Sequence, residues 1–402
     1  MGRNDLGKLA IEALAIEAEQ AKQAGALGYM ARALTMATLP HKDTSGCAFE
    51  RKNGLFHLSI LVPPSVGLPF GSIPRLLLSW VTTEAVRTGS PVLELGPTLS
   101  DFMEELGLTK NRHVTGGRTG NITRFRNQTV RLFSSTVFCR YSDKAVDAGL
   151  GFNIADEYSL WWDPKTPDQL PLWKSTVKLG SKFFQEIIER PVPIDLRALK
   201  ALKRSPLALD IYCWLTHRMF YLQKQVEIPW LLLQLQFGAD YANDAHGIRN
   251  FKFNFLKHLK NVCCIYPQAK VGEGERGLVL KPSLSHVATL PEPLNPGEWQ
   301  RYSAALQRAE ETAAATLPPP IIDKPPLLLQ TETFEKAKRA APGWDIYHLE
   351  REWQEWIAGK EKPKNPDAAF IAFCRKKYQR EECSEKKRLY KPTGSPNNKR
   401  KA

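Results

Sequence analysis

Cations and side-chain amides, with no acidic residue among them, lie on one side of a helical pattern that runs from Ala245 to Val262. Read at the helical period, the apolar residues form one stripe that would pack on a core, and they are Ile248, Phe251, Phe255, Leu259 and Val262. The outer arc carries Arg249, Asn250, Lys252, Asn254, Lys257 and Lys260. Cations can neutralise phosphates, and asparagine and arginine can read base edges in a major groove wide enough for a helix. The pattern therefore predicts a DNA-reading helix, although one helix with a solvated basic face would look the same.

A second basic segment of the same kind begins at T-G-G-R-T-G-N, residues 115–121. Its helical part would turn Ile122, Phe125, Leu132 and Phe133 inward. The DNA contacts predicted for this segment are Arg118, Arg124, Asn127 and Arg131. Two such helices in one chain favour nucleic-acid binding over an incidental basic surface.

Enzymatic motifs are missing from the sequence. The phosphate-loop pattern G-x-x-x-x-G-K-[ST] does not occur, and no H-x-H pair is present to hold the metal of a rolling-circle nickase. A polymerase would need closely spaced carboxylates for two metal ions. The best candidates, Asp240 and Asp244, precede the basic helix, where capping its N-terminus is the simpler role. The sequence predicts no enzyme, no cofactor and no metal site.

Composition agrees with a polyanionic partner. Lys and Arg number 56 and Asp and Glu number 42, a surplus of 14 positive charges over 402 residues. No apolar run reaches the roughly 18 residues of a membrane-spanning helix, and the N-terminus has no signal-peptide pattern. The seven cysteines include no C-x-x-C spacing. We expect a protein of a reducing cytoplasm that makes no membrane contact.

The elements around the two basic helices follow the same order in both halves of the chain. A proline-started long helix carries a central tryptophan, Trp80 or Trp214. A short helix then ends at Gly107 or Gly238, and the basic helix and a β-ribbon follow. The first ribbon is expected within residues 137–162, and the second at the glycines of V-G-E-G-E-R-G-L-V-L. This order predicts two tandem winged helix-turn-helix domains.

The wing of the second domain would add Lys270, Arg276 and Lys281 as contacts to phosphate or to the minor groove. A solvated hairpin explains these three cations equally well. The predicted fold class is α+β and helix-rich, with two winged helices and a small helical C-terminal segment. The predicted parts are a helical N-terminal extension (1–48), a first winged helix (49–190), a second winged helix (191–290), a Pro/Ala-rich linker (291–340), the helical C-terminal segment (341–383) and a basic, disordered tail (384–402).

Two stretches resemble the plasmid replication initiators of the RepA type. They are L-P-F-G-S-I-P-R-L-L-L-S-W-V-T-T-E-A-V-R-T-G-S-P and R-P-V-P-I-D-L-R-A-L-K-A-L-K-R-S-P-L-A-L-D-I-Y-C-W-L-T-H-R-M. The later P-G-W-D-I-Y-H-L-E-R-E-W and N-P-D-A-A-F-I-A-F-C-R-K-K resemble tails of such proteins. The resemblance implies an initiator that binds repeated origin sites, called iterons, through tandem winged helices and helps to open A·T-rich DNA.

The same resemblance implies partners. They are double-stranded plasmid origin DNA, the host initiator ATPase and the replicative helicase, with a monomer–dimer equilibrium of the initiator itself. It gives no role to the Ala-rich N-terminal extension. The alternative function is a winged-helix transcriptional repressor, which could act on its own gene, and a DNA-nicking replicase is a more distant rival.

Overall fold

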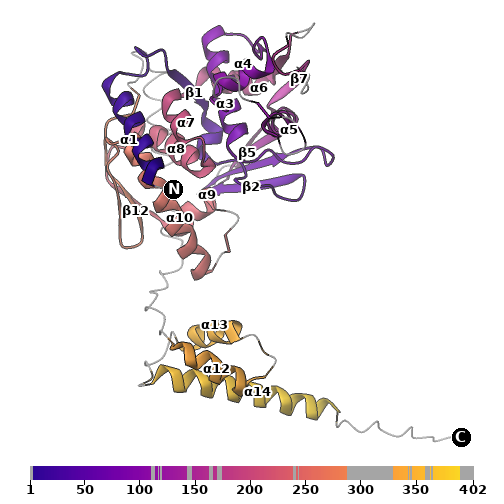
Figure 1. Cartoon of the computed structure of the whole chain (residues 1–402), viewed down its shortest axis with the longest axis vertical. Helices are drawn as coiled ribbons and strands as arrows, with labels where there is room; N and C mark the ends of the chain where they lie inside the picture. The colour runs from indigo at the N-terminus through magenta and orange to yellow at the C-terminus, as the bar shows by residue number, and fades with distance from the viewer. Residues whose placement is uncertain are drawn as a thin grey trace, which may run out of the picture. The chain divides into compact units, whose positions relative to one another are not determined.

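The structure, a computed structural model, describes residues 3–109, 114–115, 117, 120–142, 147–162, 166–169, 174–238, 241–242, 244–287, 329–342, 344, 346–357, 363 and 365–389 (Figure 1). The chain divides into two compact units, Met1–Leu317 and Pro318–Ala402. Helices and strands are mixed and helices predominate, so the predicted α+β class is confirmed.

The first winged helix is built from three helices and a three-stranded antiparallel sheet. The helices are α3 (Ser72–Thr88), α4 (Leu99–Glu105) and α5 (Asn121–Phe133). The strands are β4 (Val92–Glu94), β7 (Ala155–Ser159) and β8 (Thr176–Leu179), paired in the order β4-β8-β7. The first strand thus pairs with the third, and the hairpin of the second and third strands forms the wing.

The second winged helix repeats this plan. Its helices are α8 (Pro206–Tyr221), α9 (Trp230–Phe237) and α10 (Ala245–Ile265). Its strands are β10 (Val226–Pro229), β11 (Val271–Glu273) and β12 (Gly277–Leu280), paired in the order β10-β12-β11. The predicted internal repeat of architecture is therefore confirmed by the strand order as well as by the element order.

The N-terminal extension is not purely helical, which corrects the expectation for residues 1–48. It contains α1 (Arg3–Ala18), β1 (Leu27–Ala31) and α2 (Arg32–Met36). Strand β1 pairs antiparallel with β9 (Pro191–Asp195), the strand that leads through α7 (Leu196–Leu202) into the second winged helix. A Cβ on Gly28 would lie 2.4 Å from Leu196 Cδ2, so this glycine allows the close approach of β1 to α7. Strand β1 is short and its partner is distant in the sequence, so no local pattern predicts their pairing.

A second sheet corrects the prediction for the first ribbon. Residues 137–162 do form strands, but β5 (Thr136–Ser142) and β6 (Asp147–Asn153) join β3 (Phe56–Leu61) and β2 (Ala48–Asn53) in the order β2-β3-β5-β6. Only β7 returns to the winged helix, where β8 follows it. The β5–β6 hairpin is therefore an insertion between the third helix and the wing. Helix α6 (Ser181–Glu189) then leads to β9.

The two winged helices share one continuous core. Buried residues of the first, such as Leu77 and Phe125, and of the second, such as Leu215 and Phe255, belong to the same apolar cluster. Helix α8 is buried on all sides from Leu207 to Met219, so it passes through the centre of the unit. A shared core of this kind fixes the two winged helices relative to each other.

The C-terminal unit is a three-helix bundle with its own core. Its helices are α12 (Thr331–Ala340), α13 (Ile346–Ile357) and α14 (Pro366–Leu389). Trp353 is fully buried between them, against Phe370 at 5.4 Å between ring centroids. Helix α12 lies in the range predicted as linker, and α14 continues to Leu389 into the range predicted as tail. Residues 291–328 of the range predicted as linker and the residues from 390 onward lie outside the described part of the chain.

Candidate nucleic-acid interface

Helix α10 begins and packs as its sequence predicts. The side chain of Asp244 accepts a hydrogen bond from the backbone N–H of Gly247 at 2.6 Å, which caps the helix N-terminus. Asp240, the other predicted cap, is outside the described residues. The predicted inward stripe is confirmed, because Phe251, Phe255, Leu259 and Val262 are buried and Ile248 packs against the same core.

The opposite side of α10 is an exposed stripe of seven residues that recur every three or four positions. We call it the α10 stripe, and its members are His246, Arg249, Asn250, Phe253, Lys257, Lys260 and Cys264. Four of the six predicted DNA contacts of α10 are in it, namely Arg249, Asn250, Lys257 and Lys260. The amide of Asn250 contacts His246 Nε2 at 3.0 Å on the same stripe. The stripe therefore presents cations, an amide and one aromatic ring on a single helical face.

Two further predicted α10 contacts, Lys252 and Asn254, are also engaged with the protein itself. Lys252 Nζ lies 2.6 Å from a carboxylate oxygen of Glu273 in strand β11 and 5.2 Å from the centroid of the Trp230 ring. This ion pair ties the helix to its wing. Asn254, half-buried, donates to the backbone carbonyl of Asn250 at 3.1 Å. Both residues flank the α10 stripe, so their predicted contact with DNA remains a prediction.

The wing beside α10 is held by an acidic side chain. Glu227 Oε1 accepts hydrogen bonds from the backbone N–H groups of Arg276 and Gly277, at 2.7 and 2.9 Å. A Cβ on Gly277 would lie 1.9 Å from the carbonyl oxygen of Ile228, so only glycine fits at this close strand approach. The predicted hairpin is thus confirmed. Its three predicted phosphate contacts, Lys270, Arg276 and Lys281, are exposed.

The exposed residues of helix α5 differ in part from those predicted to contact DNA. Arg124 and Asn127 are exposed as expected, and Arg126 is an exposed cation that the sequence analysis missed. Arg131 instead donates to Asp43 Oδ1 at 2.9 Å and to the carbonyl oxygen of Leu68 at 3.0 Å, which gives it a structural role. Arg118 lies outside the described residues.

The segment before α5 is fixed by reciprocal hydrogen bonds. The backbone N–H of Thr115 donates to Asn121 Oδ1 at 2.7 Å, and the backbone N–H of Asn121 donates to Thr115 Oγ1 at 3.1 Å. Inside the helix, buried Gln128 accepts from the backbone N–H of Phe70 at 2.9 Å. The first turn of α5 and its packing against the loop before α3 are therefore well defined, as a helix that presents side chains to a ligand requires.

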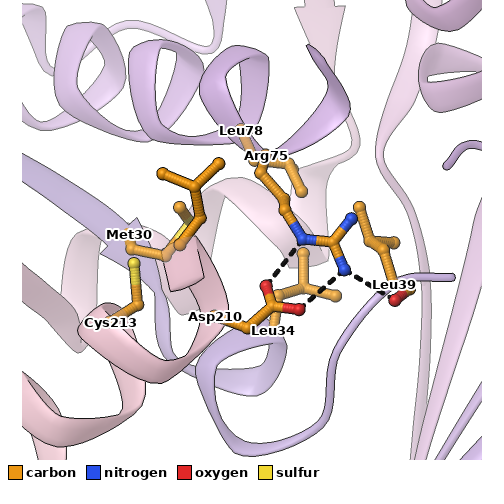
Figure 2. A pocket seen from close by; sticks show the side chains of 8 residues that line it. Met30, Leu34, Leu39, Arg75, Leu78, Asp210 and Cys213 are labelled. Atoms are coloured by element: carbon orange, nitrogen blue, oxygen red, sulfur yellow. Dashed lines mark hydrogen bonds and ion pairs between the residues drawn. The ribbon is translucent and has the colours of Figure 1, made fainter. Parts of the chain in front are cut away.

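A buried ion pair joins the first helices of the two winged helices (Figure 2). Arg75 of α3 meets Asp210 of α8 in a bidentate pair, with Nε to Oδ1 and Nη2 to Oδ2 both at 2.7 Å. The remaining guanidinium hydrogens reach the carbonyl oxygens of Leu39 at 2.7 Å, Pro40 at 3.1 Å and Gly71 at 2.7 Å. All five N–H groups of Arg75 thus have acceptors, which is the condition for tolerating a buried guanidinium.

His41 completes this cluster. Its Nε2 lies 2.7 Å from Asp210 Oδ2. Burial acts to raise the pKa of Asp210, but Arg75 and His41 outweigh it and hold that pKa below its usual value. Burial lowers the pKa of His41. Apolar side chains, among them Met30 and Leu78, line the small pocket beside the ion pair. Because Asp210 sits on one winged helix and Arg75 on the other, the pair holds α5 and α10 at a fixed separation.

Among the described residues, no three His, Cys, Asp or Glu side chains gather as metal ligands would. No helix in that part of the chain is long and apolar enough to cross a membrane. The described cysteines are free thiols, and burial raises the pKa of Cys139 to about 12. The exposed cations and amides of α5, α10 and the second wing offer ionic and hydrogen-bonding contacts.

Comparison with known proteins gives one family match and a distant structural similarity. Residues 68–230 match a protein family described as the plasmid encoded RepA protein. The match covers the described first winged helix entirely and extends through α8 and β10 to the first residue of α9. No curated protein matches the chain. Among solved structures, one similar chain is that of domains 2 and 3 of RctB, with 12% identity, a TM-score of 0.40, and coverage of 63% of this chain and 95% of that one.

Proposed function

Through residues 68–230 this chain belongs to the plasmid-encoded RepA proteins, and on that premise we propose that it initiates replication by binding repeated sites at its plasmid origin. In this proposal the protein is not an enzyme. Free energy from DNA binding drives the assembly and distortion of the origin complex, and the protein acts in the bacterial cytoplasm where the plasmid resides.

The observation that carries the proposal is the pair of winged helices in one rigid core. Each has the strand order of a winged helix, and each turns a third helix with exposed cations and an amide outward. Figure 1 shows α5 and α10 at separate places on the N-terminal unit. With the Arg75–Asp210 pair between them, the two helices would contact two DNA segments at a fixed spacing.

Each part of the surface has a role in the proposed complex. In the second winged helix, α10 enters the major groove, where Arg249 and Asn250 reach base edges and Lys257 and Lys260 contact phosphates. The wing cations contact the flanking backbone. In the first winged helix, Arg124, Arg126 and Asn127 serve a second segment. Binding several repeats would bend the origin and favour strand separation in A·T-rich DNA.

Host proteins complete the proposal. The initiator would recruit the host initiator ATPase and the replicative helicase, and would exchange between monomer and dimer. The C-terminal unit is a candidate docking site, because Trp356 on α13 is 53% exposed although the rest of that unit has a well-packed core.

The test supplies the gene in trans to a plasmid that carries only the origin region. We expect the origin plasmid to persist with the wild-type gene and to be lost with the double variant Arg249→Ala, Asn250→Ala. A repressor without initiation activity would silence a reporter placed behind its own promoter and would leave the origin plasmid unmaintained. That outcome would overturn the proposal in favour of the repressor.

A further inference from the structure

Phe253 is an exposed aromatic residue in the middle of the α10 stripe. Its side chain is 70% exposed, more than any other exposed aromatic side chain in the described residues. Of the four residues three or four positions away on the helix, Arg249, Asn250 and Lys257 are exposed and Leu256 is half-buried against the core. An apolar ring is therefore surrounded by the groups that would contact DNA.

The core does not account for this ring. Phe251 and Phe255, two positions to either side, are completely buried, and their tilted rings lie 5.5 Å apart between centroids. Phe253 lies on the opposite side of the helix from both. A single exposed apolar side chain is common on protein surfaces, so exposure alone indicates no ligand. The position of this ring does, because a large apolar group between exposed cations and an amide matches a ligand that has an apolar group among polar ones.

Major-groove DNA offers such a group. Each thymine presents its C5-methyl in the groove, next to hydrogen-bonding base edges and within reach of the phosphates. Phenylalanine is among the residues that contact this methyl group. We propose that Phe253 reads a thymine methyl group in the origin site, so that the helix recognises thymine by burying apolar surface as well as by hydrogen bonds.

This inference rests on the proposed function, because it requires α10 to lie in the major groove. It goes beyond that function by assigning a base and a chemical group to a residue. Charge complementarity fixes the occupant, since the cations Arg249, Lys257 and Lys260 on the same stripe favour a polyanion over a second copy of this basic chain.

The experiment compares thymine with uracil, which differs only by the missing methyl group. Duplexes carrying the footprinted origin site are made with each thymine replaced in turn by deoxyuridine, and the affinity of the full-length protein is measured for each. We expect one or two positions at which the replacement weakens wild-type binding by about four-fold, the effect of one buried methyl group.

The variants make the assignment specific. Phe253→Ala should bind the thymine site more weakly than wild type and should be insensitive to uracil at the same position, while Phe253→Leu keeps part of the sensitivity. Ile11→Ala is the matched control, since Ile11 is 69% exposed on α1 outside the stripe, and it should behave as wild type. Because Phe253 is exposed, its replacement should leave the melting temperature unchanged.

The outcomes separate the two claims. If the wild type does not prefer the origin duplex to a random duplex, the proposed function itself fails. Equal binding to thymine and uracil at every position, with origin preference intact, overturns only the role of Phe253. A loss of binding in Phe253→Ala that leaves uracil sensitivity unchanged, or a change in oligomeric state, also contradicts the thymine contact.

Discussion

Residues on the α10 stripe differ in what they can contact, and this difference gives a first prediction. Arg249 and Asn250 lie toward the helix N-terminus, whereas Lys257 and Lys260 lie two to three turns further on. If the first pair touches bases, Arg249→Ala and Asn250→Ala should each weaken binding to the specific site by about 1–3 kcal/mol and affect random DNA much less. Lys257→Ala and Lys260→Ala should weaken binding to the specific site and to random DNA by similar factors. Equal losses on both DNAs for all four variants, measured by titration, would show that α10 does not read sequence.

A buried histidine should make the free energy of unfolding depend on pH below neutrality. Burial lowers the pKa of His217 to about 3, and the neighbouring cations Arg32 and Arg218 add to this effect. Between that value and about 6.5, the unfolded chain binds a proton that the folded chain refuses, so stability falls as the pH falls. His217→Asn should flatten the dependence of unfolding free energy on pH by up to about 1.4 kcal/mol per pH unit. Urea unfolding at several pH values between 4 and 7 measures both slopes, and identical slopes would contradict the assignment.

Much of the residue-scale site follows from periodicity, and its exceptions come from tertiary contacts. The inward stripe, the Asp244 cap and four outward residues of α10 are all set within one helix, so the sequence predicts them. Lys252 pairs with Glu273, 21 residues along the chain, and Arg131 pairs with Asp43, 88 residues away. Nothing local marks these cations as engaged. Phe253 was not predicted as a contact, because the outward residues were chosen for charge and hydrogen-bonding groups and this one is apolar.

At the scale of elements, the link between α3 and α8 carries the next prediction. Removing one partner of a buried pair leaves the other charge without compensation, which costs about 3–5 kcal/mol. Asp210→Ala should therefore lower the free energy of unfolding by this amount, because Arg75 is left buried among Leu39, Pro40 and Gly71. The matched control is Arg87→Ala, which removes the exposed pair with Glu84 near the end of α3, the helix that carries Arg75. This variant should barely change the melting temperature. Similar melting temperatures for the two variants would show that the buried pair does not hold the helices together.

The elements themselves were predictable where they are local. Helices α3, α8 and α9 and the second wing lie where proline, glycine and apolar spacing place them. The short helix α4 was predicted by its end at Gly107, and its start is set by Thr98, whose side chain accepts a hydrogen bond from the backbone N–H of Asp101. Strand partners were not predictable, since β1 pairs with β9 across more than 160 residues and β5 leaves the winged helix for β3. Alternation along a strand specifies its two faces and says nothing of which strand lies beside it.

At the scale of the whole molecule, the two compact units have separate cores. The predicted C-terminal segment (341–383) left out α12, which adds to the core of this unit by packing against α14. A chain that ends at Pro320 should therefore keep the melting temperature of the N-terminal unit and its DNA footprint. If the C-terminal unit recruits a host protein, the same truncated chain should maintain an origin plasmid poorly. A collapse of the melting temperature would show that the unit is part of the fold, and unchanged maintenance would exclude recruitment through it.

The central claim is that both winged helices bind the plasmid origin as one rigid reader. Hydroxyl-radical footprinting of the full-length protein on its own origin DNA tests it most directly. The account predicts repeated protected sites, each made of two segments at constant spacing. Arg249→Ala with Asn250→Ala should remove protection of one segment, and Arg124→Ala with Asn127→Ala should remove the other. Uniform protection along the origin, no stronger than on random DNA of equal length, would contradict the account.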